Sequence, residues 1–231
     1  MLQLERHQDI LKLLGKQKSI TVKELCNALY ASPATIRRDL STLEEAGLLR
    51  RSHGGAVLNE IFPDQIPVTL RANKNITEKK RIAAKASALV QPGDTIFVDA
   101  STTTFYMANY LRTVQDITVI TNNPHLSIAL AECHIRNYCT GGQMLNDSVA
   151  CFGSWAERCV RSIRADKFFF SARGICDGVI TDSSKNECDI KRAMMECSRH
   201  SYFCCGSEKQ GKLYPYVIAD ASAPDEIIDE S

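Results

Sequence analysis

Apolar residues recur three or four positions apart over the first 45 residues, which is the spacing of amphipathic helices. The first apolar stripe consists of Leu4, Ile10, Leu11 and Leu14. We expect Gly15 to end that helix, because glycine is common just past the end of a helix. Thr21 and Glu24 have the spacing of a capping box, so a second helix is predicted from there to about Leu29.

A third helix is predicted to begin at Ser32 and Pro33, since serine is a favoured N-cap and the fixed φ of proline suits the first turn. Ile36, Leu40 and Leu43 fall in one sector at about 100° per residue, so they should pack on the first two helices. The other face carries Ala34, Thr35, Arg37, Arg38, Ser41 and Thr42. Such a face fits the major groove of DNA, where arginine can donate two hydrogen bonds to guanine, but most arginine pairs on helices simply face solvent.

The segment GLLRRSHGGAV, residues 47–57, has the pattern of a helix stop, a strand, a two-glycine turn and a returning strand. Arg50, Arg51 and His53 come directly before the turn, where they could reach a phosphate backbone or the adjacent minor groove. Three helices followed at once by a basic hairpin are typical of a winged helix-turn-helix. We therefore assign residues 1–57 to a DNA-binding domain.

The pattern changes after the hairpin. Residues 58–70 contain two prolines, mixed polarity and no clear period, which is typical of a linker. A second domain is predicted over residues 71–231. Thr77 is expected to cap its first helix, which should reach about Val90, and the three cations at positions 79–81 are expected to be solvated.

Beyond that helix, apolar runs alternate with helical stretches. The expected strands are 95–99, 117–121, 135–139, 167–171 and 201–205, and the expected helices are 103–111, 124–132, 155–163 and 186–199. Strands interleaved with helices predict an α/β domain with a largely parallel sheet that is covered on both faces.

Charge and composition agree with a small basic domain joined to a larger one. Residues 1–57 hold nine Lys and Arg against six Asp and Glu, and the totals of 28 and 27 leave nineteen against twenty-one for the rest. The start of the chain is polar and no stretch approaches the roughly 20 apolar residues of a membrane span, so we expect a cytoplasmic protein without a membrane partner. The ten cysteines form no C-x-x-C pair, so most should be reduced. Neither a metal site nor a cofactor is expected.

Three loops follow expected strands, at the edge of the sheet where ligands of such folds bind. The run VDASTTTFYM places Asp99 and the four hydroxyl side chains 101–104 at a helix start, which suits an anion such as phosphate. An ordinary helix cap would need only one of these hydroxyls. Asn122 in VITNN and the glycine pair 141–142 in CTGGQ suit a ligand as well, but both patterns are also common in turns.

The run ASPATIRRDLSTLEEAGLLRRSHGGAVL closely resembles the N-terminal signature of the DeoR family of bacterial transcriptional regulators, and the resemblance continues through most of the chain. In that family the TIRRDL helix is the recognition helix. The resemblance implies DNA contacts by Thr35, Arg37 and Arg38, with Arg50, Arg51, His53 and Gly54 in the wing. Ser41 joins these candidates because it shares the polar face of the helix.

The three loops coincide with the D-x-[GS]-T-T-T, T-N and G-G elements of the family's sensor domain. That domain resembles ribose-5-phosphate isomerase and CoA-transferase folds and typically binds a phosphorylated sugar or a related metabolite. The resemblance implies an effector site lined by Asp99, Ser101, Thr102, Thr103, Asn122, Gly141 and Gly142. It adds Glu187 and Lys191, although a Glu–Lys pair four residues apart is usually a surface pair, and it aligns Lys209 with a family lysine.

One loop departs from the family pattern. Where many members have G-x-D-G, this chain has Ser171-Ala-Arg-Gly174, so Arg173 replaces an acidic residue. A cation at this position could pair with a phosphate or a carboxylate of the ligand. Arg173 is therefore included among the candidate effector-binding residues.

Two functions of different classes remain open on the residues alone. The first is a transcriptional regulator, expected to be a repressor of a carbohydrate-metabolism operon. It would bind a double-stranded DNA operator and a phosphorylated sugar effector as a homodimer or larger homo-oligomer. The second is a sugar-phosphate isomerase or hydrolase with an accessory DNA-binding domain, since Asp99, Asp177, Glu187 and Lys191 offer acid–base groups. No nucleophile or metal motif supports the second, so we expect a regulator rather than an enzyme.

Overall fold

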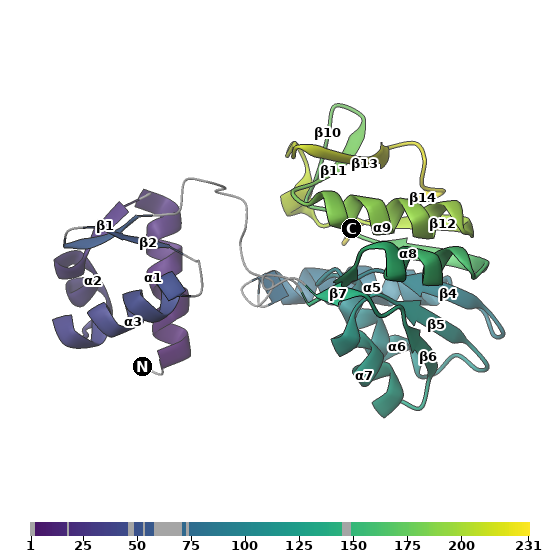
Figure 1. Cartoon of the computed structure of the whole chain (residues 1–231), viewed down its shortest axis with the longest axis horizontal. Helices are drawn as coiled ribbons and strands as arrows, with labels where there is room; N and C mark the ends of the chain where they lie inside the picture. Colours follow the sequence, from purple (N-terminus) through teal and green to yellow (C-terminus); the bar gives the residue numbers. More distant parts are fainter. Residues whose placement is uncertain are drawn as a thin grey trace. The chain divides into compact units, whose positions relative to one another are not determined.

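The computed structural model of the protein divides into two compact units, Met1–Leu70 and Arg71–Ser231. It describes residues 3–17, 19–45, 49–52, 54–57, 71–72, 74–144 and 149–231. The predicted linker, residues 58–70, lies outside these ranges. We call the first unit the head and the second the C-terminal domain, and Figure 1 labels the helices and strands of both.

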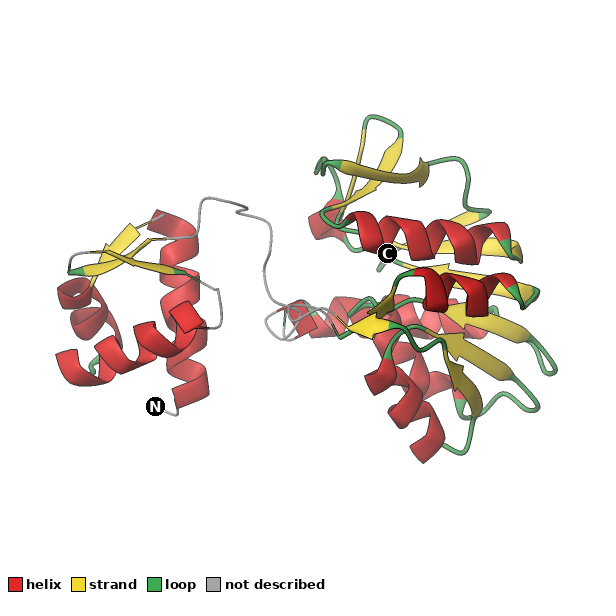
Figure 2. Ribbon diagram, viewed as in Figure 1, coloured by secondary structure: helices red, strands yellow, loops and turns green. Residues whose placement is uncertain are grey.

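The head combines three helices with a small antiparallel sheet (Figure 2). The helices are α1 (Gln3–Gln17), α2 (Val22–Leu29) and α3 (Pro33–Glu45), and the strands are β1 (Ser19–Thr21), β2 (Arg50–Ser52) and β3 (Gly55–Val57), in the order β1-β3-β2. The predicted apolar stripes meet in one core, where Leu14, Ile36 and Leu40 are almost fully buried. Helices this short owe most of their stability to such packing.

In the head, the capping signals of the sequence predict where α2 and α3 begin, but the glycine signal does not predict where α1 ends. The capping box is present: the Glu24 N–H donates to Thr21 Oγ1 at 3.2 Å, and the Thr21 N–H donates to the Glu24 carboxylate at 2.7 Å. Ser32 accepts from the Thr35 N–H at 3.2 Å, as expected of an N-cap. The prediction that Gly15 ends the first helix is wrong, because α1 continues past it. Glycine inside a helix costs only about 1 kcal/mol relative to alanine, which tertiary packing can override.

A six-stranded parallel sheet forms the centre of the C-terminal domain. Its order is β14 (Glu226–Ile228), β12 (Ser198–Cys204), β9 (Ala165–Phe170), β4 (Thr95–Val98), β5 (Thr118–Thr121) and β6 (Arg136–Cys139). Every pairing between neighbours is parallel. The predicted α/β class and parallel sheet are thus confirmed, and β14 is the strand of this sheet that the sequence analysis missed.

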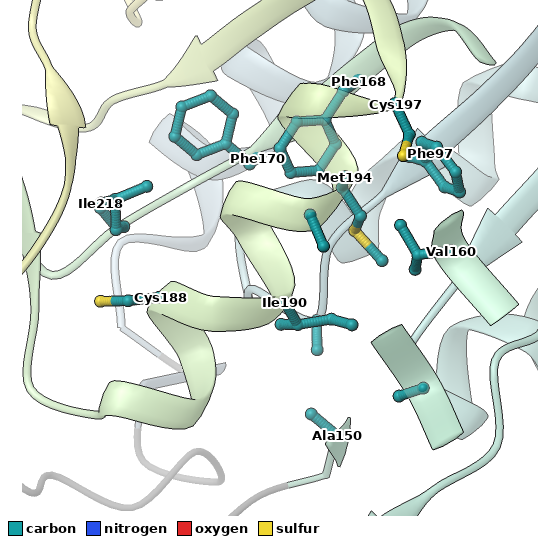
Figure 3. Packing of buried hydrophobic residues seen from close by; sticks show 14 of the residues in the cluster. Phe97, Ala150, Val160, Phe168, Phe170, Cys188, Ile190, Met194, Cys197 and Ile218 are labelled. Carbon is teal, nitrogen blue, oxygen red and sulfur yellow. The ribbon is translucent and has the colours of Figure 1, made fainter. Parts of the chain in front are cut away.

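Helices cover both faces of this sheet (Figure 1). One face packs against α5 (Ile76–Ala88), η1 (Thr104–Met107), α6 (Ala108–Leu111) and α7 (Pro124–Glu132), and the other against α8 (Ser154–Arg161) and α9 (Lys185–Glu196). Neighbouring residues of β9 point to opposite faces. Phe169 belongs to the apolar cluster under α5, η1, α6 and α7, and Phe168 and Phe170 belong to a second cluster under α8 and α9. Figure 3 shows the second cluster, in which Met194 of α9 lies among these rings. This alternation is what a strand buried on both faces requires.

Smaller elements surround the carboxyl edge of the sheet. They are an antiparallel sheet of β10 (Gly174–Cys176), β11 (Val179–Asp182) and β13 (Tyr216–Asp220), a hairpin of β7 (Gln143–Met144) and β8 (Cys151–Phe152), and η2 (Ser207–Lys209). None of them was predicted, because they interrupt the alternation of apolar runs and helical stretches from which the strands of the main sheet were recognised.

Three local expectations in the C-terminal domain are wrong. Asn75 rather than Thr77 precedes α5, and its left-handed backbone (φ 55°) starts the helix without a side-chain cap. Lys79 is not solvated: it lies on the inward face of α5 at 5% exposure, and its Nζ donates to the Arg71 carbonyl. The helix expected over 103–111 is a four-residue 3₁₀ turn followed by one α-helical turn.

Candidate nucleic-acid interface and effector site

The polar face of α3 is open to solvent. Arg37 and Arg38 are exposed, and neither side chain has a hydrogen bond or ion pair within the described part of the head. Thr35 is partly exposed, and its hydroxyl is 2.9 Å from that of Ser32 at the helix start. Two guanidinium groups at the N-terminal end of a helix are therefore available to an anionic partner.

The hairpin is attached to the same helix. Arg51 Nη1 of β2 donates to Ser41 Oγ of α3 at 2.8 Å, and the Arg51 N–H donates to the Glu44 carboxylate at 2.7 Å. Arg50 is exposed beside it and has no side-chain partner among the described residues. Two predicted DNA-binding residues, Ser41 and Arg51, are thus brought together by the fold and bond to each other.

The turn of the hairpin depends on glycine. Gly54 has φ +93°, a left-handed conformation that glycine adopts without strain. At Gly55 a Cβ would lie 2.3 Å from the Ile20 carbonyl oxygen, so only glycine lets β3 come this close to β1. His53, the remaining candidate in this turn, lies outside the described residues.

A buried carboxylate holds α3 against α1. Asp39 is 1% exposed. Its Oδ2 accepts from Arg6 Nε at 2.5 Å and its Oδ1 accepts from Arg6 Nη2 at 3.0 Å, and His7 Nε2 lies 3.0 Å from the same Oδ1. Burial alone would raise the pKa of Asp39, but the hydrogen bonds from Arg6 and His7 outweigh it and lower the pKa below its usual value. The sequence analysis missed this residue, which follows the two candidate arginines directly.

In the C-terminal domain the carboxyl ends of three neighbouring strands lie side by side. Val98 of β4 is opposite Thr121 of β5 and Phe169 of β9. The loops that begin at Asp99 and Asn122 therefore open at the same edge of the sheet. This is the edge at which the sequence predicts an effector site.

Asp99 connects the loops at this edge. Its fully buried carboxylate accepts from the Ser171 N–H at 3.0 Å, the Ser101 N–H at 3.2 Å and the Thr104 hydroxyl at 2.7 Å. Ser101 Oγ in turn accepts from the Thr104 N–H at 3.1 Å, as an ordinary cap would. Two of the four consecutive hydroxyls thus bond within their own loop, and Thr102 and Thr103 have no such bond within it.

Lys191 is enclosed by carboxylates. Its Nζ lies 3.0 Å from Asp182, 3.1 Å from Glu187 and 3.7 Å from Asp99, and its side chain is 3% exposed. Burial would lower the pKa of Lys191, but these three carboxylates outweigh it and raise the pKa. The Glu187–Lys191 pair is therefore an internal ion pair rather than a surface pair.

Asp182, which the sequence analysis missed, is the last residue of β11 in the run VITD, and Asp99 comes directly after β4 in the run IFVD. An apolar run that ends in aspartate was the signal that could have found it.

Lys209 is buried among neutral acceptors. At 7% exposure, its Nζ donates to Ser171 Oγ, to Thr103 Oγ1 at 3.3 Å and to the Cys204 carbonyl at 3.4 Å. Within the described residues no carboxylate oxygen lies within 4.0 Å of this ammonium group. Burial lowers the pKa of Lys209, because a charge without a close counterion is costly away from water.

Asn122 and the glycine pair lie at the ends of the adjacent strands. Asn122 is fully buried, and its Nδ2 donates to the Cys151 carbonyl at 3.2 Å, whereas its Oδ1 has no partner in the described structure. Gly142 has φ +120°, and a Cβ there would lie 2.5 Å from the Phe152 carbonyl oxygen. Gly141 has φ +64° and open space around it. The chain's own packing against β8 is thus sufficient reason for glycine at 142.

Arg173 lies on the loop between β9 and β10. Its N–H donates to the Thr181 carbonyl at 3.2 Å, and its side chain is half-buried. Burial, and next the guanidinium of Arg173, lower the pKa of Arg71 to about 10, while the carboxylates of the Lys191 cluster act in the opposite direction. Arg173 and the Lys191 cluster thus share an electrostatic neighbour, Arg71, which the sequence analysis did not single out.

Within the described ranges, no set of His, Cys, Asp and Glu side chains is arranged to hold a metal ion. Nor does this part of the chain contain a helix of the length and apolarity needed to cross a membrane.

Solved structures share the fold of the C-terminal domain at low sequence identity. The eIF2B delta structure from Chaetomium thermophilum superposes with a TM-score of 0.52 at 14% identity, over 71% of this chain and 59% of that chain, so this chain spans less than two thirds of its length. The ribose 5-phosphate isomerase A from Methanocaldococcus jannaschii has a TM-score of 0.45 at 11% identity, over 59% of this chain and 55% of that one. The first is a likeness of fold alone, and neither says what this chain binds.

Curated transcriptional regulators are similar to nearly the whole chain. The uncharacterized HTH-type transcriptional regulator FruR of Bacillus subtilis (strain 168) is 36% identical over 217 residues, which cover 92% of this chain and 85% of the relative. The HTH-type transcriptional regulator GolR of Listeria innocua is 33% identical over 233 residues, covering 100% and 92%. The lactose phosphotransferase system repressor of Staphylococcus epidermidis is 34% identical over 212 residues, covering 90% and 84%.

Two family descriptions match consecutive parts of the chain. The DeoR-like helix-turn-helix domain matches residues 6–62, and the DeoR C terminal sensor domain matches residues 74–231. Both agree with the resemblance that the sequence motifs indicated, and they favour a regulator over the isomerase or hydrolase. The chain therefore belongs to the DeoR family of transcriptional regulators.

Proposed function

We propose that this protein is a repressor that binds an operator through α3 and the β2–β3 hairpin, and that a phosphorylated sugar bound in the C-terminal domain controls its affinity for DNA. The observation that carries the proposal is that one chain contains two different kinds of cationic site. One is an exposed helix face whose arginines have no partner in the described part of the head, and the other is a buried ammonium group, Lys209, that no carboxylate of the described residues contacts. The similarity to a lactose phosphotransferase system repressor supports a role in carbohydrate metabolism.

Arg37 and Arg38 are the proposed readers of DNA. An exposed guanidinium can donate two hydrogen bonds to one guanine edge, and small side chains such as Thr35 allow the helix to approach the bases. Arg50 is proposed to contact the phosphate backbone from the hairpin, and Arg51 and Ser41 to fix the position of the hairpin on the helix.

Lys209 is the proposed phosphate contact. Its ammonium group is already desolvated, so an anion that binds beside it meets little screening by water. The hydroxyl of Thr103, which accepts from Lys209, can also donate to a phosphate oxygen, whereas the hydroxyl of Ser171 donates to the Cys204 carbonyl. Asn122 Oδ1, which has no donor among the described residues, suits a sugar hydroxyl.

The assembly and place of action follow from the same proposal. A single winged head buries too little surface for tight specific binding, so a homodimer or larger homo-oligomer with two half-sites is proposed. Because an operator is reached where the DNA lies, we also propose that the protein acts in the cytoplasm.

A thermal-shift comparison of phosphorylated sugars with their unphosphorylated parents tests the effector site on the full chain. A phosphorylated sugar at 100 times its dissociation constant should stabilise the folded protein by about 2.7 kcal/mol, and its parent sugar should have little effect. Lys209→Gln should abolish the shift, whereas Lys212→Gln, which removes an exposed lysine nearby in sequence, should retain it. The effector proposal fails if parent sugars shift the protein equally, or if no phosphorylated sugar shifts it.

A further inference from the structure

Arg173 is held in place at the edge of the proposed effector site. Two residues before it, Ser171 donates its N–H to Asp99 and contacts Lys209 through its hydroxyl. The Arg173 N–H is bonded to the Thr181 carbonyl at 3.2 Å. The residue after it, Gly174, is packed so closely that a Cβ there would lie 2.1 Å from the Lys212 carbonyl oxygen. The backbone that carries Arg173 is therefore fixed on both sides.

Arg173 is half-buried as a residue, and its guanidinium has no hydrogen-bond or ion-pair partner among the described side chains. The nearby carboxylates of Asp99, Asp182 and Glu187 converge on Lys191 instead. Arg71 adds a second positive charge in the neighbourhood of Arg173. A positive charge in this position favours an anion from outside the protein.

Lys209 of η2 and Arg173 both belong to the surroundings of the short loop 171–173 between β9 and β10. Lys209 contacts the hydroxyl of Ser171, and Arg173 follows two residues later beside β11. A single phosphate needs only one of these cations as its close counterion. A guanidinium is also well suited to a second group, because its planar fork matches the two oxygens of a carboxylate or a phosphate.

We propose that Arg173 binds a second anionic group of the effector, so that the preferred ligand is a doubly anionic sugar, either a sugar bisphosphate or the phosphate of a sugar acid. This inference rests on the proposal that the site binds a phosphorylated sugar at Lys209. It goes further by naming the residue that selects among such sugars. The two ligand types share the same chemistry at Arg173, namely an anion that accepts two parallel N–H donors.

The test compares three ligands on the full chain by thermal shift and calorimetry: a hexose monophosphate, the bisphosphate of the same hexose, and the monophosphate of the corresponding sugar acid. We expect at least one doubly anionic ligand to bind about 10- to 100-fold more tightly than the monophosphate, the range for a hydrogen bond to a charged group. The ligand that gains shows whether the second group is a phosphate or a carboxylate.

Variants assign the gain to Arg173. Arg173→Gln should weaken binding of the doubly anionic ligand about 10- to 100-fold, far more than it weakens binding of the monophosphate. Arg112→Gln, an exposed arginine elsewhere in the domain, should keep the full preference. The melting temperature without ligand checks that each variant folds, and the wild-type ligand comparison stands even if one does not.

The outcomes separate this inference from the proposed function. If monophosphates bind but neither second anion improves affinity, or if Arg173→Gln keeps the preference, the role of Arg173 is overturned and the phosphate site stands. If no phosphorylated sugar binds at all, both proposals are overturned.

Discussion

The head and the C-terminal domain use positive charge in opposite ways. In the head, Arg37, Arg38 and Arg50 are exposed and unpaired within the described structure. In the C-terminal domain, Lys191 and Lys209 are buried, the first among carboxylates and the second among neutral acceptors. The difference indicates two kinds of anion: a long polyanion that exposed side chains can follow, and a small molecule that fixed groups enclose.

Solvent exposure also decides how strongly salt acts on each site. Exposed charges are screened over a Debye length of about 8 Å at physiological ionic strength, and buried charges are screened much less. Holding a lysine away from water is costly unless partners are fixed around it. The two regions should therefore respond differently to the loss of one charge and to added salt.

The largest effect is expected where a buried cation is removed. Lys191→Met should lower the free energy of unfolding of the C-terminal domain by about 3–5 kcal/mol, because three carboxylates lose the cation they share. Hydrogen exchange of peptides from β9 in increasing urea measures this loss. The loss should become smaller in acid, since protonation removes the repulsion between the carboxylates.

The matched control lies on the same helix. Lys185 forms an exposed ion pair with Asp189 at 2.6 Å, and Lys185→Met should leave the stability of the domain unchanged. Equal losses in the two variants would contradict the contrast between buried and exposed cations.

The next largest effect is expected at Asp39, a buried charge of the head. Asp39→Asn should destabilise α3 by about 1.5–3 kcal/mol, because hydrogen bonds from Arg6 and His7 to a carboxylate are weakened. Hydrogen exchange of α3 peptides in the full chain measures this change.

The pH dependence of that effect has a definite sign. The folded pKa of Asp39 is lowered, so its contribution is complete above the unfolded pKa of about 3.9 and is lost as the pH falls through the folded pKa. The difference between wild type and Asp39→Asn should therefore disappear in acid. A difference that stays constant with pH would rule out the charge as its cause.

A smaller change in free energy is expected when the exposed arginines of the head are removed, and it concerns DNA binding rather than stability. Arg38→Ala should weaken binding to operator DNA by about 1–3 kcal/mol and relax the sequence preference. Arg50→Ala should weaken binding to all sequences alike and reduce the salt slope by about 1. Gel-shift titrations at two salt concentrations measure both effects, with Arg112→Ala as the control. If the wild-type protein shows no preference for the promoter of its own operon over random DNA, the DNA-reading role is refuted.

The smallest effect is expected for salt on effector binding. Between about 50 and 200 mM salt, DNA affinity should fall by orders of magnitude, whereas affinity for the phosphorylated sugar should change by less than about tenfold. Calorimetry of the effector over this range measures the second quantity. A fall as steep as that for DNA would place the effector on an exposed surface instead.

Much of the fold was predictable because it depends on local periodicity. The apolar stripe of Ile36 and Leu40 predicts an inward helix face, and the capping box at Thr21 predicts a helix start. The main strands of the parallel sheet were recognised because their apolar runs alternate with helical stretches. The strands of the smaller sheet of the C-terminal domain, β10, β11 and β13, interrupt that alternation and were missed, although β13 is longer than β4.

The chemistry of the candidate site was predictable only in part, because many partners come from distant parts of the chain. Asp39 pairs with Arg6, 33 residues away, and Lys209 contacts Thr103, 106 residues away. The spacing of Glu187 and Lys191 suggests a surface pair, and only the fold shows that three carboxylates bury this lysine. Lys79 was expected in solvent because its neighbours are charged, yet the turn of α5 places it inward.

Gly55 ties the reach of the hairpin to the interior of the head. A single added methyl group would collide with the backbone at Ile20 and force β3 outward. Because β2, which carries Arg50, is paired to β3, the displacement would be transmitted to the far strand of the sheet. A substitution at Gly55, which has no functional group of its own, would thus shift the position from which Arg50 contacts its partner. The hydrogen atom that glycine carries in place of a Cβ therefore helps to set the position of the hairpin.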